Sequence, residues 1–179
     1  MNIAVFCASR MGHNPQFQST AQALGQLIAL HGHTLVYGGS NLGYMGTVST
    51  AALDAGGHVI SIIPTIFSSE VINSQPRAET RLVSSMQERK SMMIDICDAF
   101  IALPGGVGTL DEIFEVLMSN QLNLCNKAMG LLNVDGYFDP LLQQIQRMIS
   151  EGLLSPTSIR ALITDSTPKS LLQQIIHYN

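Results

Sequence analysis

Short runs of apolar residues alternate along the chain with longer amphipathic segments, and this alternation constrains the fold more than any other feature. The apolar runs have the length of buried strands, and the longer segments carry apolar residues at helical spacing. Such units are typical of a parallel sheet with helices on both faces. We therefore expect an α/β fold, a Rossmann-like three-layer sandwich with a mainly parallel sheet, as a single domain over residues 1–179.

The pattern predicts the bounds of each element. The expected strands are Ile3–Ala8, Thr34–Tyr37, His58–Ile63, Arg81–Val83, Ala99–Leu103, Ala128–Leu132 and the edge strand Ala161–Thr164. The expected helices are Pro15 to about Gly32, capped by Asn14, then Thr47–Ala55, Met86–Cys97, Leu110–Leu122, Phe138–Glu151 and Lys169–Tyr178. The stretch Thr65–Thr80 lacks a clean period and is predicted to be a long irregular connection.

Composition narrows the class of protein. Hydrophobic residues make up 46% of the 179 and charged residues 12%, which fits a chain that buries a sizeable core. The formal net charge of −4 provides no basic field for a nucleic-acid backbone, so we expect no nucleic-acid partner. No apolar run approaches the roughly 20 residues that span a bilayer, and no basic export signal opens the chain. Three cysteines without metal-ligand spacing fit a reducing compartment, so we expect a cytoplasmic protein with no membrane partner.

A glycine-rich loop, Pro104–Thr109, joins the expected strand Ala99–Leu103 to the next helix. Its three glycines let the backbone approach a ligand closely. The free N–H groups and the dipole of a helix start favour an anion such as phosphate, and the Thr109 hydroxyl can cap the helix or donate to a phosphate oxygen. The alternative is a plain turn with a good cap. Strand, glycines and helix start together favour a phosphate site.

Two charged residues lie on the apolar stripe of the predicted helix Met86–Cys97. Helical spacing from Met86 places Arg89, Lys90 and Met93 on one inward face. Charges are rare on such a face unless they are paired or bind a ligand. Either both long side chains extend from the helix end into solvent, or they meet a phosphate or carboxylate partner at the edge of the sheet.

An acid, Glu112, stands in the first turn of the helix that follows the glycine loop. Taken alone, it can simply complement the helix dipole, and this interpretation also fits Asp111 and Glu115. Glu112 becomes a stronger candidate for a functional residue because the neighbouring helix carries Arg89 and Lys90 on its inward face.

Several common enzyme motifs are missing from the sequence. The second glycine-rich stretch, Gly38–Gly46, follows the second strand, whereas the dinucleotide fingerprint belongs after the first, where Ala8–Gly12 does not match it. The stretch also lacks the lysine of a P-loop. These departures argue against a nicotinamide dehydrogenase and an NTPase. The histidines form no H-E-x-x-H motif, and no serine sits in a G-x-S-x-G elbow.

Two linked motifs resemble the Lonely guy family of cytokinin riboside 5′-monophosphate phosphoribohydrolases, whose members were often labelled possible lysine decarboxylases. The family signature P-G-G-x-G-T-x-x-E, preceded by M-x-x-R-K, is intact as Pro104–Glu112 and Met86–Lys90. The stretches Phe6–Ser9, Tyr37–Gly46 and Gly130–Tyr137 are similar to family landmarks too, so the resemblance covers nearly the whole chain.

The resemblance implies hydrolysis of AMP, or of an N6-modified AMP, to free base and ribose 5-phosphate. It implies that Arg89 and Glu112 are catalytic and that Lys90 and the glycine loop bind the nucleotide substrate. The predicted substrate-binding residues are Ser9, Gly38, Gly39, Met86, Lys90, Gly105, Gly106, Val107, Gly108, Thr109 and Asp111. Two alternatives stay open: a nucleotide-binding protein without catalysis, and an enzyme that passes the phosphoribosyl group to an acceptor other than water.

The resemblance also implies a homodimer with sites near the interface, to which the helix Met86–Cys97 could contribute. We expect no metal and no cofactor, and the sequence has no evident pyridoxal phosphate site to support a decarboxylase. The chain departs from the family pattern at Ala8, Arg10, Ser40, Met118 and Ser119, positions that bear on the choice of base.

Overall fold

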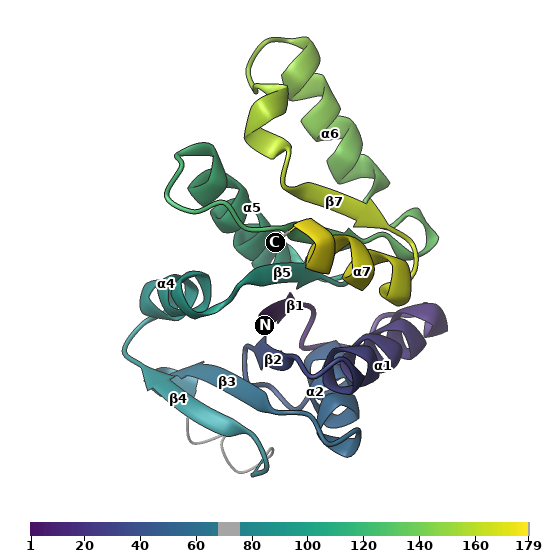
Figure 1. The fold of residues 1–179 in the computed structure, drawn as a ribbon, viewed down its shortest axis with the longest axis vertical. Helices are drawn as coiled ribbons and strands as arrows, with labels where there is room; N and C mark the ends of the chain where they lie inside the picture. The colour runs from purple at the N-terminus through teal and green to yellow at the C-terminus, as the bar shows by residue number, and fades with distance from the viewer. Residues whose placement is uncertain (68–75, 179) are drawn as a thin grey trace.

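A seven-stranded sheet forms the centre of the molecule (Figure 1). The computed structural model describes residues 1–67 and 76–178. Every strand pair in the sheet is parallel, and the strand order is β4-β3-β2-β1-β5-β6-β7. The strands are β1 (Asn2–Phe6), β2 (Thr34–Tyr37), β3 (Val59–Pro64), β4 (Glu79–Val83), β5 (Ala99–Ala102), β6 (Met129–Leu132) and β7 (Leu162–Asp165).

Helices cover both faces of this sheet, which confirms the predicted three-layer α/β fold. One face is covered by α1 (Pro15–Leu30), α2 (Gly43–Asp54) and α7 (Pro168–Tyr178). The opposite face is covered by α4 (Met86–Ile96), α5 (Val107–Gln121) and α6 (Asp139–Ser150). Short 3-10 turns are η1 (Thr65–Phe67), η3 (Val134–Gly136) and η4 (Pro156–Ile159), none of which was predicted. No helix in the described part of the chain is long and apolar enough to cross a membrane.

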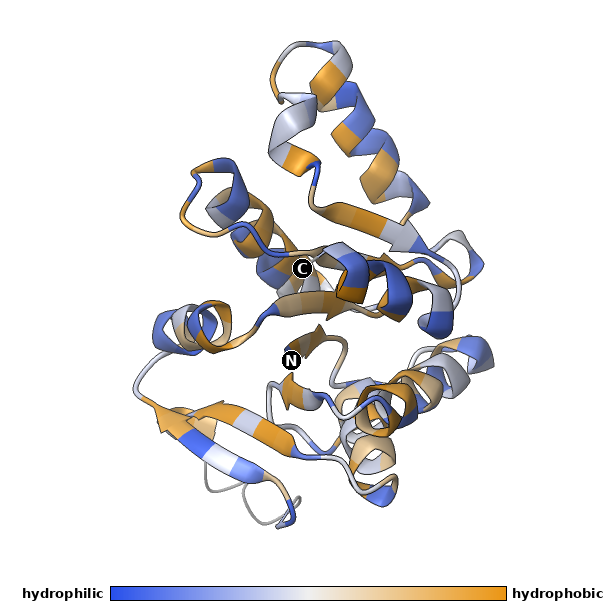
Figure 2. Cartoon of the chain, in the orientation of Figure 1, coloured by the Kyte–Doolittle hydropathy of each residue, from blue (hydrophilic) through white to orange (hydrophobic). Residues whose placement is uncertain are grey.

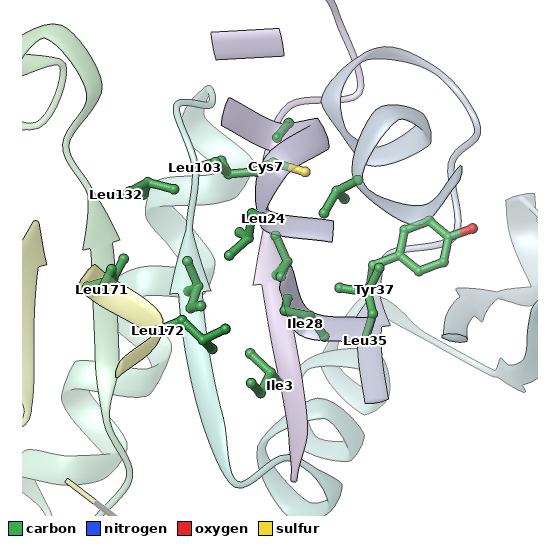
Figure 3. Packing of buried hydrophobic residues seen from close by; sticks show 14 of the residues in the cluster. Ile3, Cys7, Leu24, Ile28, Leu35, Tyr37, Leu103, Leu132, Leu171 and Leu172 are labelled. Carbon is green, nitrogen blue, oxygen red and sulfur yellow. The ribbon is translucent and has the colours of Figure 1, made fainter. Parts of the chain in front are cut away.

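Two apolar layers hold the helices to the sheet. Along β1, Ile3 and Val5 belong to the layer under α1 and α7, whereas Ala4 and Phe6 belong to the layer under α4 and α5. This alternation follows from the two-residue period of a strand, and burial on both faces explains why the central strands read as continuous apolar runs. Figure 3 shows part of the first layer, and Figure 2 shows that the central strands are hydrophobic whereas edge strand β4 is mixed.

The order in which successive strands are added to the sheet reverses between β1 and β5. The first four strands are added outward from β1 to β4, and α4 then returns the chain to the other side of β1, where β5 pairs with it from Ile3↔Ala99 to Phe6↔Ala102. In open parallel sheets a crevice forms at such a switch point, beyond the carboxyl ends of the two strands. The segments that follow β1, β2 and β5 therefore converge there.

Two helices begin earlier than the sequence indicates. The glycine-rich stretch Gly38–Gly46 was expected to be a loop throughout, but α2 begins at Gly43. The N–H groups of Tyr44 and Met45 donate to the carbonyl of Ala8, 3.0 and 3.2 Å away, so the cap comes from a distant loop. Because this cap is a tertiary contact, local sequence signals could not reveal it.

Helix α5 begins at Val107 rather than at Leu110, so Val107, Gly108 and Thr109 form its first turn. The N-cap is Gly106, and no side chain caps the helix. Thr109 is therefore the third helical residue, and the expectation that it could be the cap is wrong. Glycines on both sides of Val107 weaken the helical signal, which is the physical reason for the error.

The predicted irregular connection Thr65–Thr80 falls partly on residues 68–75, which lie outside the described residues. At its two ends, Thr65–Phe67 forms η1, and β4 begins at Glu79, two residues before the expected strand. The remaining strands match their predictions to within two residues, including β7 at the edge of the sheet.

Candidate active site

A cavity of about 760 Å³ opens at the switch point between β1 and β5. Its volume lies within the roughly 300–1,000 Å³ that is typical of small-molecule sites. The walls come from the segments that follow β1, β2, β3 and β5, from the first turns of α4 and α5, and from the segment after β6. This is the place where an open parallel sheet binds its ligand.

Ten of the thirteen predicted site residues line this cavity. They are Ser9, Gly38, Met86, Arg89, Gly105, Gly106, Gly108, Thr109, Asp111 and Glu112. Gly39, Lys90 and Val107 are not among the lining residues in the part of the chain that the structure describes. Val107 is 84% exposed, because the first turn of α5 directs its side chain to the surface.

Arg89 of α4 and Glu112 of α5 form an ion pair in the cavity wall, with Nη1 and Oε1 2.8 Å apart. Their side chains are only 7% and 6% exposed. Ser85 sets the start of α4, because its hydroxyl accepts the N–H of Glu88, and this start places Arg89 one turn into the helix. The two helices thus deliver opposite charges to one buried point beside the cavity.

The backbone of Gly38, directly after β2, packs against the guanidinium of Arg89. A Cβ atom at Gly38 would collide with Nη2 of Arg89. The absence of a side chain at this position therefore makes room for the buried arginine. The close approach also explains why a glycine follows the strand at this point, although its φ is not positive.

Burial dominates the titration of the acidic partner. Desolvation raises the pKa of Glu112 above its ordinary value, and the charge and hydrogen bond of Arg89 oppose this rise. The carboxylate is consequently more basic than an exposed glutamate. Burial also raises the pKa of the nearby Cys7 thiol, which lines the same cavity and therefore stays protonated and weakly nucleophilic.

The N-terminus of α5 faces the cavity with backbone groups. Gly105, Gly106 and Gly108 line it, and the first-turn N–H groups of a helix have no intrahelical partners. A Cβ at Gly105 would collide with the Thr109 side chain, so the loop folds tightly onto the helix start. Because no side chain caps the helix, its N–H groups and dipole suit an anion, which favours the phosphate-site interpretation over a plain capped turn.

Lys90 points between the helices rather than toward the cavity. Its Nζ lies 3.1 Å from Asp111 and 3.0 Å from Glu115, and its side chain is 13% exposed. The hydrogen bond to Glu115 is the largest cause that raises the pKa of Lys90, and Asp111 adds to it. Lys90 therefore ties α4 to α5, while Arg89 alone of the two basic residues reaches the cavity wall.

Four aromatic residues of the cavity were not predicted as site residues: Phe17, Tyr44, Phe67 and Tyr137. Phe17 of α1 meets Tyr44 and Tyr137 edge-on, at centroid distances of 6.3 and 5.4 Å. The hydroxyl of Tyr44 accepts the N–H of Gly12, 2.8 Å away. These residues carried no site signal in the sequence, because Phe17 lies in the expected helix from Pro15 and Phe67 in the expected irregular connection, while Tyr44 and Tyr137 stood out only as parts of the family landmarks.

No group of three or more His, Cys, Asp or Glu side chains that could hold a metal ion occurs within residues 1–67 and 76–178. The three cysteines are free thiols.

Comparisons with known proteins agree on one family. A family model described as possible lysine decarboxylase matches residues 45–175. The cytokinin riboside 5′-monophosphate phosphoribohydrolase LOG of Oryza sativa subsp. japonica is 43% identical over 176 residues, which cover 98% of this chain and 73% of that protein. The phosphoribohydrolase LOG3 of Arabidopsis thaliana is 42% identical over 176 residues, covering 98% and 82% of the two chains.

Solved structures show the same fold. The molybdenum cofactor binding protein from Rippkaea orientalis superposes with a TM-score of 0.73 at 27% identity, covering 98% of this chain and 95% of that one. The Moco carrier protein from Chlamydomonas reinhardtii gives a TM-score of 0.74 at 20% identity, covering 99% and 96%, a likeness that speaks for the fold alone. Together with the intact motifs and the near-complete match to the plant enzymes, these findings show that the chain belongs to the Lonely guy (LOG) family.

Proposed function

We propose that this protein hydrolyses the N-glycosidic bond of a nucleoside 5′-monophosphate, yielding the free base and ribose 5-phosphate. The observation that carries the proposal is the buried Arg89–Glu112 pair, which stands in the cavity wall beside the uncapped N-terminus of α5. The helix start supplies the anion site, and the pair supplies a carboxylate near it. These are the groups that cleavage of a phosphorylated nucleoside needs.

The substrate phosphate is proposed to bind at the glycine loop and the first turn of α5. Backbone N–H groups there can donate to the phosphate oxygens without carrying a formal charge, and the helix dipole adds to the attraction. This anchor would hold the ribose at a fixed distance from the wall formed by α4 and α5. Binding of the phosphate would therefore also orient the N-glycosidic bond that is to be cleaved.

Cleavage of an N-glycosidic bond develops positive charge on the ribose. We assign Glu112 to stabilise this charge and to orient and deprotonate the attacking water. The bond between C1′ and the base nitrogen breaks, the water oxygen bonds to C1′, and the departing base gains a proton. Burial, by raising the pKa of Glu112, makes its carboxylate a better base for this step.

Arg89 is assigned to hold Glu112, or the substrate, in position. Its guanidinium lies 2.8 Å from the Glu112 carboxylate, and its planar fork leaves further N–H groups for another acceptor. The guanidinium also favours the ionised carboxylate, which the reaction requires. Of the other predicted residues, Ser9, Gly38 and Met86 line the cavity and are proposed to contact the substrate.

AMP or an N6-modified AMP is the proposed substrate, and cytokinin biosynthesis the proposed pathway, because the plant relatives are named for cytokinin riboside 5′-monophosphates. Apolar side chains line part of the cavity and would suit a purine ring or an apolar N6 group. These side chains are Met11, Phe17, Met45, Ile63, Phe67 and Met86.

The test is incubation of the protein with a panel of nucleoside monophosphates, followed by chromatography for free base and ribose 5-phosphate. Hydrolysis gives both products in equal amounts. A nucleotide-binding protein without catalysis would bind AMP and release no base, and a transferase would release base without ribose 5-phosphate. The buried carboxylate beside the anion site favours hydrolysis over binding alone.

We also propose a homodimer, which rests on the family resemblance and on one face of α5. Exposed apolar side chains recur along this helix at intervals of seven, four and four residues, which places them on one side. They are Val107, Phe114, Met118 and Leu122, exposed by 84, 41, 50 and 54%. A second copy of the chain would cover this row, which starts between Gly106 and Gly108 of the cavity wall.

The proposed location is the cytoplasm. Its support is the state of the cysteines, since Cys7, Cys97 and Cys125 are all free thiols. Free thiols persist in a reducing compartment, whereas exported proteins tend to pair them.

A further inference from the structure

The loop proposed to bind phosphate is held by a side chain from outside the family signature. The hydroxyl of Tyr137 donates to the carbonyl oxygen of Gly105 at 2.5 Å. Gly105 belongs to the segment after β5, and Tyr137 follows η3 after the neighbouring strand β6. The contact therefore ties two segments at the carboxyl edge of the sheet, and both residues line the cavity.

This hydrogen bond fixes more than one oxygen atom. In a trans peptide the C=O of Gly105 and the N–H of Gly106 point in opposite directions, so holding one fixes the other. Glycines on both sides of this peptide permit several orientations, and the bond selects one of them. Thr109 packs against Gly105 from the helix, so the loop is clamped between α5 and Tyr137.

Tyr137 is itself well anchored. Its ring meets Phe17 edge-on at 5.4 Å and Phe138 edge-on at 5.1 Å. The turn that carries it is tied to the start of α1, because Asn14 Nδ2 donates to Asp135 at 3.0 Å. The ring therefore keeps its position when the hydroxyl is removed, which isolates the hydroxyl as the variable.

We propose that Tyr137 is a positioning residue for substrate phosphate: it holds the Gly105–Gly106 peptide so that the N–H groups at the start of α5 are presented together. The inference rests on the proposed function for the identity of the anion. Without the hydroxyl, the loop must be ordered by the ligand at the moment of binding, and the affinity for phosphate-bearing ligands falls. Ligands without phosphate do not use the loop and keep their affinity.

The test compares wild type with Tyr137→Phe, using Tyr178→Phe as the matched control. Tyr178→Phe removes the same oxygen atom from another tyrosine, whose hydroxyl donates to Asn126 Oδ1 3.2 Å away. Neither Tyr178 nor Asn126 lines the cavity. Calorimetry measures the dissociation constants of ribose 5-phosphate and adenosine directly, and that of AMP in a Glu112→Gln background, which should bind the nucleotide without consuming it. Tyr137→Phe is expected to weaken the binding of ribose 5-phosphate and AMP by about three- to tenfold, which is the effect of one hydrogen bond. The affinity for adenosine is expected to stay unchanged.

With AMP as substrate, KM is expected to rise by the same factor while kcat stays within about twofold, since ground state and transition state share the phosphate contact. Equal affinities of wild type and Tyr137→Phe for ribose 5-phosphate would overturn the inference. So would an equal loss for adenosine, or no binding of ribose 5-phosphate by the wild type. A wild type that binds AMP but releases no adenine would refute the proposed hydrolysis alone, because the binding comparison stands without turnover.

Discussion

Arg89 and Glu112 lie 23 residues apart in the chain, yet their charged groups meet 2.8 Å apart at the wall of the cavity. Both side chains are almost completely buried. A buried ion pair is weak evidence for stability, because removing two charges from water offsets most of their attraction. Its location beside the uncapped N-terminus of α5, which we propose to bind the substrate phosphate, indicates a functional reason for the pair.

Replacing the acid should stop the reaction and spare the ligand site. Glu112→Gln keeps the size of the side chain and removes its charge, so kcat for AMP should fall about 10²- to 10⁴-fold, the usual contribution of a positioned base. Glu115→Gln is the matched control, because Glu115 lies one turn further along α5 and pairs with Lys90. Steady-state assays of base release check both variants, and a Glu112→Gln enzyme with full activity would refute the assigned role.

Breaking the pair from the basic side should also destabilise the fold. Arg89→Met leaves Glu112 buried without its partner, which should lower the free energy of unfolding by about 3–5 kcal/mol. The double variant Arg89→Met/Glu112→Leu removes both charges and should recover most of that loss while remaining inactive. Urea unfolding of Arg89→Met, Glu112→Leu and the double variant measures the coupling energy between the two side chains. Strictly additive changes in the free energy of unfolding would show that the pair does not interact.

Adding a side chain at Gly38 should disturb the position of Arg89 without removing any charge from the site. A Cβ at Gly38 would collide with the Arg89 guanidinium, so Gly38→Ala should displace Arg89 from Glu112. We expect kcat to fall at least tenfold, while circular dichroism shows an unchanged secondary structure; a 1 Å misplacement can have an effect of this size. Unaltered kinetics would mean that the exact place of Arg89 is unimportant.

The acid limb of the pH profile of kcat/KM should reflect the titration of Glu112. Its pKa is raised above the ordinary value of 4.5, mainly by burial, and the reaction requires the ionised form. Activity is therefore present above the raised pKa and is lost as the pH falls through it, at a higher pH than for an exposed glutamate. Measuring kcat/KM against pH tests this, and a limb at or below 4.5 would argue against a buried base.

The proposed dimer can be tested through its apolar row on α5. Met118→Asp places a charge in this row and should convert a dimer into a monomer, because an unpaired charge is unfavourable in a buried interface. Leu153→Asp is the control, since Leu153 is 80% exposed in the turn after α6, away from the row. Light scattering after gel filtration gives the mass of each variant, and a monomeric wild type would contradict the proposal.

The sequence predicted the fold and singled out Arg89 because both depend on strong local patterns, whereas the partner of Arg89 was left open between solvent, a phosphate and a carboxylate. Buried strands such as β2 read as apolar runs, and Arg89 stood out as a charge on an apolar helix face. Lys90 stood out for the same reason, but its partners Asp111 and Glu115 come from another helix, and spacing within α4 could not reveal them. The start of α2 escaped prediction likewise, because the carbonyl of Ala8 caps it from a distant loop.

The most direct test of the account is a crystal structure of the Glu112→Gln variant with AMP, since this variant should bind the nucleotide without consuming it. We predict the phosphate on the N–H groups at the start of α5, and the side chain of residue 112 facing C1′ of the ribose. A phosphate bound elsewhere, or a residue 112 side chain turned away from the ribose in every copy, would contradict the account.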